Sequence, residues 1–227
     1  MSPAGWIDAE PRAGQERSDP EAAMMTDEQA MWRVQMHDDA QAFAELVRRW
    51  EDPILRLGVR ILGDVQRAED VAQEAFARVF TRRRDFDPAA RFSTWLWQIA
   101  VNLCRDELRR RERRRETELD GGFGAADGED GAPPALEVVA PEAGPAEATE
   151  RLERAEMVRR AVLRLPEPYR VVVALRHYEG LRFHEVAEVL GLPEGTVKSR
   201  MAEALDRLET LLRPWAESGA SPGREPR

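Results

Sequence analysis

Residues 92–115 read FSTWLWQIAVNLCRDELRRRERRR, and their apolar spacing predicts one long amphipathic helix. Ser93 or Thr94 can cap its start, because a side-chain oxygen there accepts a hydrogen bond from a free N–H group of the first turn. At 100° per residue, one side of this helix is apolar and is expected to face a core. That side carries Trp95, Leu96, Ile99, Ala100 and Leu103.

The opposite side of the helix is polar, and its end is strongly basic. Gln98, Asn102, Arg105 and Arg109 fall together on this side, and six arginines lie between Arg109 and Arg115. A basic helix end alone is most simply interpreted as a solvated surface that the helix macrodipole favours. A second DNA-reading motif farther along the chain favours a nucleic-acid-binding face instead.

Composition limits the class of protein. The chain has 227 residues, 42% of them apolar and 34% charged, which allows two modest soluble domains. No stretch approaches the roughly 18 apolar residues of a membrane span, and the N-terminus lacks a signal sequence, so we expect a cytoplasmic protein without membrane insertion. A single cysteine, Cys104, and three scattered histidines predict no disulfide framework, no metal site and no cofactor.

The net charge of −9 is unevenly distributed. Residues 116–150 hold ten acidic and no basic residues, and residues 1–30 hold seven acidic and two basic ones. The rest is basic, with 18 basic against 14 acidic residues in 31–115 and 14 against 12 in 151–227. This asymmetry indicates, modestly, that the folded parts bind a polyanion.

The patterns predict an all-α protein of two helical domains. Five segments are expected: a disordered tail at 1–25, a helical domain at 26–115, a flexible acidic linker at 116–149, a helical domain at 150–213 and a C-terminal tail at 214–227. Met24 or Met25 is an alternative start that the sequence does not decide.

In the first domain, helices are expected from Thr26 to about residue 36, from near Asp39 to Gly63, and over about 65–80. Pro53 is expected to kink or restart the second of these. The third helix is expected to face the core with Ala68, Val71, Ala72, Ala75, Phe76 and Val79. Its outward side carries Asp70, Gln73 and Glu74, a cluster that is most often plain surface and whose functional interpretation is a protein-docking patch.

The second domain contains the most specific local pattern. Helices are expected over about 148–165 and, after a Pro-Glu-Pro break, 169–178. A short helix at 183–190, a turn at Gly191-Leu192-Pro193 and a longer helix then form a helix-turn-helix. The longer helix has the core stripe Val197, Met201, Ala204, Leu205, Leu208 and Leu211, and its N-terminal end, where base edges and phosphates would be met, carries Thr196, Lys198, Ser199 and Arg200.

The chain combines two DNA-reading helices with an acidic linker between them and a docking face before them. In this combination it resembles the extracytoplasmic-function (ECF) sigma factors, the small members of the sigma-70 family. The resemblance covers about residues 26–115 (region 2) and 150–213 (region 4). Its most specific pieces are residues 68–76 (AEDVAQEAF), 92–102 and 190–200 (LGLPEGTVKSR).

The resemblance implies a function and a set of partners. The chain would bind core RNA polymerase, through the clamp helices of its largest subunit and its flap region, and direct promoter recognition and opening without chemistry of its own. Asp70, Gln73 and Glu74 would face the clamp helices. An anti-sigma factor is a further partner of many relatives, although no residue selects one here.

The resemblance also divides the DNA contacts. A base flipped from the −10 element would be held by Asn102 and by the loop at 86–91, with Phe86 and Arg91. Gln98 lies on the same face of the helix. Arg105 and Arg109 would bind the nearby DNA backbone. Thr196, Lys198, Ser199 and Arg200 would meet the −35 element. Glu203 departs from the family pattern, because relatives often carry arginine nearby, and its role stays open.

Two other functions compete with this interpretation. An autonomous regulator that binds an operator through its helix-turn-helix would leave the Asp70 face and the helix at 92–115 unexplained. An enzyme acting on nucleic acid is opposed by the sequence, which has no catalytic triad pattern, no clustered carboxylates and no phosphate-binding glycine loop.

Overall fold

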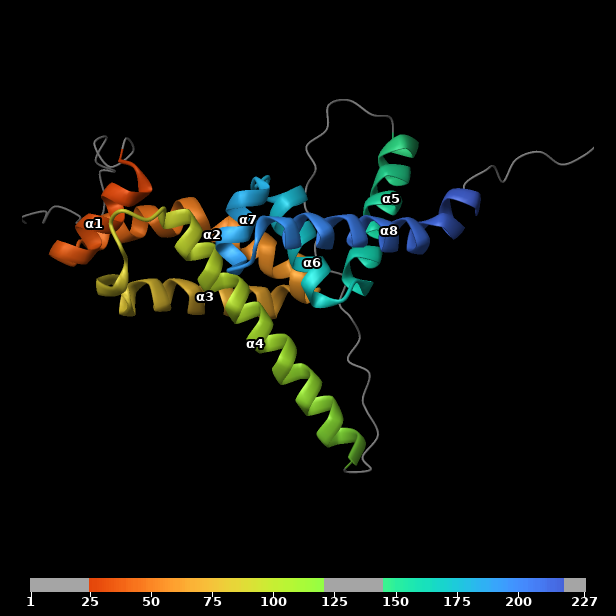
Figure 1. Cartoon of the computed structure of the whole chain (residues 1–227), viewed down its shortest axis with the longest axis horizontal. Helices are drawn as coiled ribbons and strands as arrows, with labels where there is room; N and C mark the ends of the chain where they lie inside the picture. Colours follow the sequence, from red (N-terminus) through yellow and green to blue (C-terminus); the bar gives the residue numbers. More distant parts are fainter. Residues whose placement is uncertain (1–24, 121–144, 219–227) are drawn as a thin grey trace, which may run out of the picture.

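The computed structural model describes residues 25–120 and 145–218, and every regular element in them is helical (Figure 1). This confirms the predicted all-α class. The first stretch, here called the N-terminal lobe, contains α1 (Asp27–His37), α2 (Ala40–Leu62), α3 (Val65–Thr81), the short 3-10 helix η2 (Arg83–Asp85) and α4 (Phe92–Asp120). The predicted tail before residue 25, the middle of the predicted linker and the last nine residues lie outside the described residues.

Residues 145–218 form the C-terminal lobe. It contains α5 (Pro145–Arg164), α6 (Glu167–Val173), the π-helical turn η3 (Ala174–Tyr178), α7 (Phe183–Leu190) and α8 (Glu194–Ser218). None of the described helices is both long enough and apolar enough to cross a membrane.

The helix starts follow from capping residues. Thr26 Oγ1 accepts from the Gln29 amide at 3.2 Å while Gln29 Oε1 accepts from the Thr26 amide at 3.0 Å, a reciprocal capping box. Asp39 accepts from two amides of the first turn of α2, and Asp64 accepts from the Arg67 amide of α3. Gly63 ends α2 with a φ of 75°, a left-handed conformation that glycine adopts without strain.

α2 is one continuous helix through Pro53, so of the two alternatives given for this residue the restart is wrong. Leu46 and Ile54 on either side of the proline are fully buried, and their packing offsets the missing backbone hydrogen bond. Two predicted boundaries also differ from the structure. α4 and α5 each extend into the predicted linker. Residues 116–120 contain no helix breaker, and Pro145 occupies the first turn of α5, where its missing N–H is no loss.

The two lobes share an apolar core. Leu46, Leu57, Phe92 and Leu96 of the N-terminal lobe belong to the same buried cluster as Leu175 of the C-terminal lobe. α2 contacts α5, α6 and η3, and α4 contacts α7. A smaller cluster lies within the C-terminal lobe between α5, α6 and α8. The lobes are therefore packed together directly.

Helices α2 and α3 approach each other closely at Gly58 of α2. A Cβ atom built at Gly58 would lie 2.9 Å from the Ala68 Cβ of α3 and 3.1 Å from its Cα. We expect Gly58→Ala to destabilise the protein by about 1–3 kcal/mol, as overpacking of a tight contact does. Thermal unfolding checks this, and the exposed Ala77→Gly change, which adds no volume, is its control for altered helix propensity.

Candidate nucleic-acid and protein interfaces

The polar face of α4 forms as predicted, although the buried side of the helix differs from the predicted apolar stripe. Asn102 and Arg109 are exposed, and Gln98 and Arg105 are half-buried. Trp95 and Ile99 are only half-buried, because α4 contacts α2 and α3 as well as α7 and its buried arc is shifted. The fully packed side chains are Phe92, Leu96, Trp97, Ala100, Val101, Leu103 and Cys104. Burial raises the pKa of the Cys104 thiol to about 12, so it is unreactive.

The loop before α4 differs from the prediction at Phe86. This side chain is only 3% exposed, and its ring packs 5.2 Å from the Trp95 ring and 6.2 Å from the Phe92 ring. The Gln35 amide donates to the Phe86 carbonyl at 3.0 Å and thereby fixes the loop. Phe86 therefore anchors the loop from inside and does not present its ring to solvent, whereas Arg91 is exposed.

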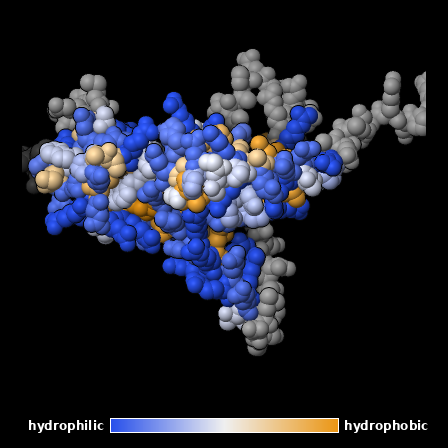
Figure 2. Space-filling model, viewed as in Figure 1, coloured by the Kyte–Doolittle hydropathy of each residue, from blue (hydrophilic) through white to orange (hydrophobic). Residues whose placement is uncertain are grey.

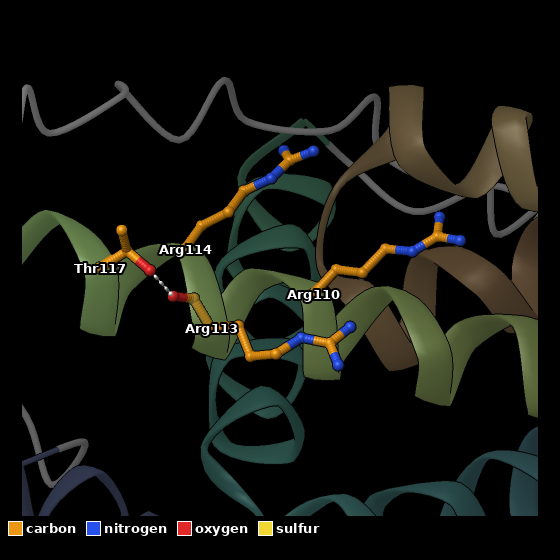
Figure 3. A pocket seen from close by; sticks show the side chains of 4 residues that line it. All are labelled: Arg110, Arg113, Arg114 and Thr117. Carbon is orange, nitrogen blue, oxygen red and sulfur yellow. Dashed lines mark hydrogen bonds between the residues drawn. The ribbon is translucent and has the colours of Figure 1, made fainter.

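The last turns of α4 form a projecting cationic end (Figures 1 and 2). Arg110, Arg113 and Arg114 line a shallow hollow with Thr117, whose hydroxyl donates to the Arg113 carbonyl at 2.9 Å (Figure 3). Arg110 lies 3.8 Å from the Glu107 carboxylate, a long ion pair. These guanidinium groups are available to an external anion such as a phosphate.

The outward side of α3 also matches its prediction. Asp70, Gln73 and Glu74 are exposed, while Ala68, Val71, Ala72, Ala75, Phe76 and Val79 are all buried. Glu74 pairs with Arg78 one turn along the helix at 2.9 Å, so Asp70 carries most of the uncompensated charge of this face. The exposed carboxylates offer acceptors to a cationic protein surface.

The helix-turn-helix consists of α7, a turn at Gly191 and the first half of α8. Gly191 adopts a φ of 63°, which permits the tight turn. Lys198 and Ser199 are exposed, and Thr196 and Arg200 are half-buried. Lys198 pairs with Glu194 at 2.7 Å, and this hydrogen bond lowers the pKa of Glu194.

Two further positions of α8 complete its exposed surface. Glu203 pairs with Arg207 at 2.8 Å, so its negative charge is partly compensated within the helix. Leu205, which the periodicity places in the core stripe, is 52% exposed. The stripe narrows there because Ala204 is the residue that points into the lobe core, and Leu205 lies 100° around the helix from it.

Contacts between the lobes involve residues that the sequence did not single out. Arg60 of α2 pairs with Glu179 at 2.5 Å, and its guanidinium lies 4.4 Å from the centre of the Tyr178 ring. Burial raises the pKa of Glu179 and lowers that of Arg60, so the loss of water outweighs their mutual attraction. Arg170 donates to the Ile61 carbonyl. These partners are more than 100 residues apart in sequence, and no local pattern relates them.

No cluster of three or more potential metal ligands occurs in the part of the chain that the structure describes.

Comparisons with known proteins agree with this arrangement. Residues 46–114 match the family model of Sigma-70 region 2, and residues 155–208 match that of Sigma-70, region 4. The ECF RNA polymerase sigma factor SigW of Bacillus subtilis is 37% identical over 175 residues, which are 77% of this chain and 91% of that one. The RNA polymerase sigma-H factor of Pseudomonas aeruginosa is 36% identical over 83% of this chain and 94% of its own length.

Solved structures share the fold. CnrH in complex with the cytosolic domain of CnrY has a TM-score of 0.58 at 24% identity, covering 83% of this chain and 97% of that one. RpoE from Bartonella quintana, bound to the anti-sigma factor NepR, has a TM-score of 0.58 at 20% identity, covering 77% and 98%.

The protein is a promoter-specificity subunit, an RNA polymerase sigma factor. It belongs to the ECF group of the sigma-70 family, with region 2 in the N-terminal lobe and region 4 in the C-terminal lobe. The alternative of an autonomous operator-binding regulator is wrong, because the region 2 match covers the α3 face and α4, which such a regulator does not need.

Proposed function

We propose that this chain binds core RNA polymerase through the exposed side of α3, reads and opens the −10 element with α4 and its preceding loop, and docks α8 on the −35 element. It performs no chemistry of its own and acts in the cytoplasm. The observation that carries the proposal is that both family matches coincide with exposed polar faces of the predicted kind.

The division of labour on α4 follows from side-chain chemistry. Asn102 is exposed, and its amide has both a donor and an acceptor for the edge of a base that has left the stack. The arginines from Arg109 onward are always charged and suit phosphate oxygens, which position DNA without reading its sequence. Phe86 supports the shape of the loop from the core.

Region 4 would meet both DNA and polymerase. The start of α8 carries Lys198, Ser199 and Arg200 toward the −35 element. The exposed Leu205, farther along the same helix, provides an apolar contact for the polymerase flap region. Lys198 must give up its ion pair with Glu194 before it can bind a phosphate, which lowers its net contribution to the affinity for DNA.

A mutant pair tests the −35 assignment. We expect Lys198→Ala with Arg200→Ala to reduce use of a −35-dependent promoter roughly tenfold or more, because each contributes a phosphate or base contact worth about 1 kcal/mol. Glu203→Arg is expected to act in the opposite direction and strengthen duplex binding. Run-off transcription measures promoter use and gel shifts with duplex DNA measure the affinity, and an unchanged affinity of Glu203→Arg would place residue 203 away from DNA.

Run-off transcription with purified core polymerase over a genomic fragment library tests the function as a whole. We expect the chain to direct initiation at a defined set of promoters, and to bind those fragments much more tightly with core polymerase than without it. Equal binding without polymerase, or no transcripts, would contradict the proposal.

We also propose control by an anti-sigma factor. The solved relatives include a complex of RpoE with the anti-sigma factor NepR. Affinity purification of the tagged chain from cells in which the factor is inactive would identify such a partner. Added to the run-off assay, this partner should suppress the transcripts.

A further inference from the structure

A single hydroxyl group lies among the arginines at the end of α4. Thr117 is exposed, and its hydroxyl donates to the Arg113 carbonyl at 2.9 Å (Figure 3). The threonine lines one shallow hollow together with Arg110, Arg113 and Arg114. The match to Sigma-70 region 2 ends at residue 114, so the family model gives Thr117 no role.

The helical spacing brings Thr117 within reach of two guanidinium groups. Arg114 and Arg113 precede it by three and four positions, and residues so spaced lie on the same helix face with their Cβ atoms about 5–6 Å apart. The Thr117 Cβ is tilted toward the start of the helix, over the turn that carries both arginines. The arginine side chains extend in that direction too (Figure 3), and rotation about their flexible bonds can turn them back toward Thr117.

A phosphate group on Thr117 would therefore find cationic partners. Phosphothreonine carries a charge of about −1.5 to −2 and three strong acceptor oxygens. Arg113 and Arg114 are exposed, and the contact of Arg110 with Glu107 is a long one of 3.8 Å. Guanidinium groups bind phosphate oxygens through charge-assisted, often bidentate, hydrogen bonds. The hollow is thus suited to a phosphate attached to its own threonine.

The sequence before Thr117 suits a kinase that selects basic substrates. Of the serines and threonines in the chain, only Thr117 follows a run of arginines, Arg113 to Arg115, with Glu116 between. Such kinases recognise arginines two and three positions before the acceptor hydroxyl through carboxylates in their substrate cleft.

The end of α4 is also accessible to an enzyme. Arg105 pairs with Glu167 of α6 at 2.7 Å, but residues 112–117 farther along the helix are all exposed. This part of α4 is therefore held by its own backbone hydrogen bonds, and such segments open locally at a small free-energy cost. A kinase can bind it in an extended conformation.

Phosphorylation would act directly on the DNA contact of α4. Residues 109–116 contain six arginines and two glutamates, a net charge of +4. A phosphate of about −2 halves this charge. It also removes the hydroxyl proton that bonds the Arg113 carbonyl, and it places negative charge near the negative end of the helix dipole. Both effects withdraw arginines from the promoter backbone.

We propose that Thr117 is a phosphorylation site, and that its phosphate binds Arg113 and Arg114 in place of the DNA backbone. This inference rests on the proposed contact of the α4 arginines with that backbone. A serine/threonine kinase would supply the phosphoryl group from ATP. The bond from Thr117 Oγ1 to the γ-phosphorus forms, the bond from this phosphorus to the oxygen bridging the β- and γ-phosphates breaks, ADP leaves, and the hydroxyl proton passes to a base of the kinase.

Labelling with radioactive ATP tests the modification. Extracts of growing and of stationary cells that produce the factor are incubated with the full-length chain. We expect Thr117→Val, which removes the hydroxyl and keeps the shape, to lose most of the label. Thr210→Val should keep it, because Thr210 is equally exposed and bonds its own helix at 3.0 Å but follows a single arginine, Arg207. No label from either extract, or equal label in all three proteins, would overturn the proposal.

Promoter binding tests the effect. Phosphothreonine is incorporated at position 117 during synthesis of the full chain, and the holoenzyme is measured on a duplex found by run-off transcription. We expect an affinity about ten- to thirtyfold lower at about 0.15 M salt, and a salt dependence smaller by about two phosphate contacts. Phosphothreonine at position 210 carries the same charge and should leave the affinity nearly unchanged. Equal losses at both positions would show a general repulsion and would overturn the proposal.

The arginines themselves are tested by Arg113→Gln combined with Arg114→Gln. In this variant, phosphothreonine at position 117 should have little further effect on affinity, because the groups that it withdraws are already absent. Phosphorus NMR gives a second readout on the free factor. The second pKa of phosphothreonine, about 6, should be lower at position 117 than at 210, because nearby cations favour the dianion. A full further loss of affinity, or equal pKa values at the two positions, would overturn the capture of the phosphate by these arginines.

The unphosphorylated arginine variant separates this inference from the function on which it rests. If Arg113→Gln with Arg114→Gln leaves the affinity and salt dependence of the holoenzyme unchanged, the proposed backbone contact of this part of α4 fails. If that variant binds the promoter more weakly and phosphothreonine at position 117 does not, only the regulation by phosphorylation fails.

Discussion

Replacing Asp70 and Glu74 together by alanine is expected to weaken association with core polymerase by roughly thirtyfold or more. The loss of charged partners at a protein interface costs about 2 kcal/mol or more, which is roughly thirtyfold in Kd. Folding should be nearly unaffected, because both side chains are exposed and only the Glu74–Arg78 pair, worth about 0.3–0.5 kcal/mol, is lost.

A matched control is available on α2. Glu51 and Asp52 are also exposed, and their double alanine variant removes the same charge from a different helix. Fluorescence anisotropy of labelled factor with core polymerase measures all three proteins, and thermal unfolding reports their stability. Equal losses in both double variants would show a general charge effect, and a lowered Tm in the Asp70/Glu74 variant would point to folding.

Asn102→Ala is expected to remove sequence preference at one position of the −10 element. A good side-chain contact to a base edge is worth about 1–3 kcal/mol of discrimination, or roughly five- to more than a hundredfold. Asn102 is exposed on a helix whose other side is packed, so the change leaves the core intact. Holoenzyme binding to −10 strands substituted base by base measures this effect, and permanganate footprinting follows promoter opening.

Arg109→Ala provides the contrast. The Arg109 side chain is 68% exposed. Its removal should weaken DNA binding evenly across sequences and should lower the salt dependence of the binding constant by the equivalent of about one phosphate contact. Loss of the same base preference in both variants would contradict the division between reading and positioning on α4.

Local chemistry made much of this fold predictable. The caps at Thr26 and Asp39 and the glycine turn at Gly191 each act within a few residues, so the helix starts and the turn could be predicted from sequence spacing. The α3 stripe was correct at all six positions because a single helix face is buried there.

The errors arose where burial depends on distant partners. The Phe86 side chain packs in the core against Trp95 and Phe92, although the family resemblance placed it against a flipped base. Leu205 is exposed although its spacing suited a stripe, because nothing in the described structure covers that side of α8 closely. The pairing of Arg91, Gln98 and Arg105 with region 4 joins residues at least 62 positions apart, beyond the reach of any periodicity.

The projecting end of α4 has a consequence for the speed and direction of encounter with DNA. About 12 residues separate Arg105 from Thr117, so at 1.5 Å each the cationic tip extends roughly 18 Å beyond the contact with α6. Ionic screening at physiological salt acts over about 8 Å. Within that distance the six arginines from Arg109 to Arg115 outnumber the nearby acids Glu112 and Glu116, so these turns of α4 present a local positive charge although the whole chain has a net charge of −9. If α4 meets the DNA backbone as proposed, we expect encounters led by these basic turns to be accelerated, at a rate that falls as salt rises.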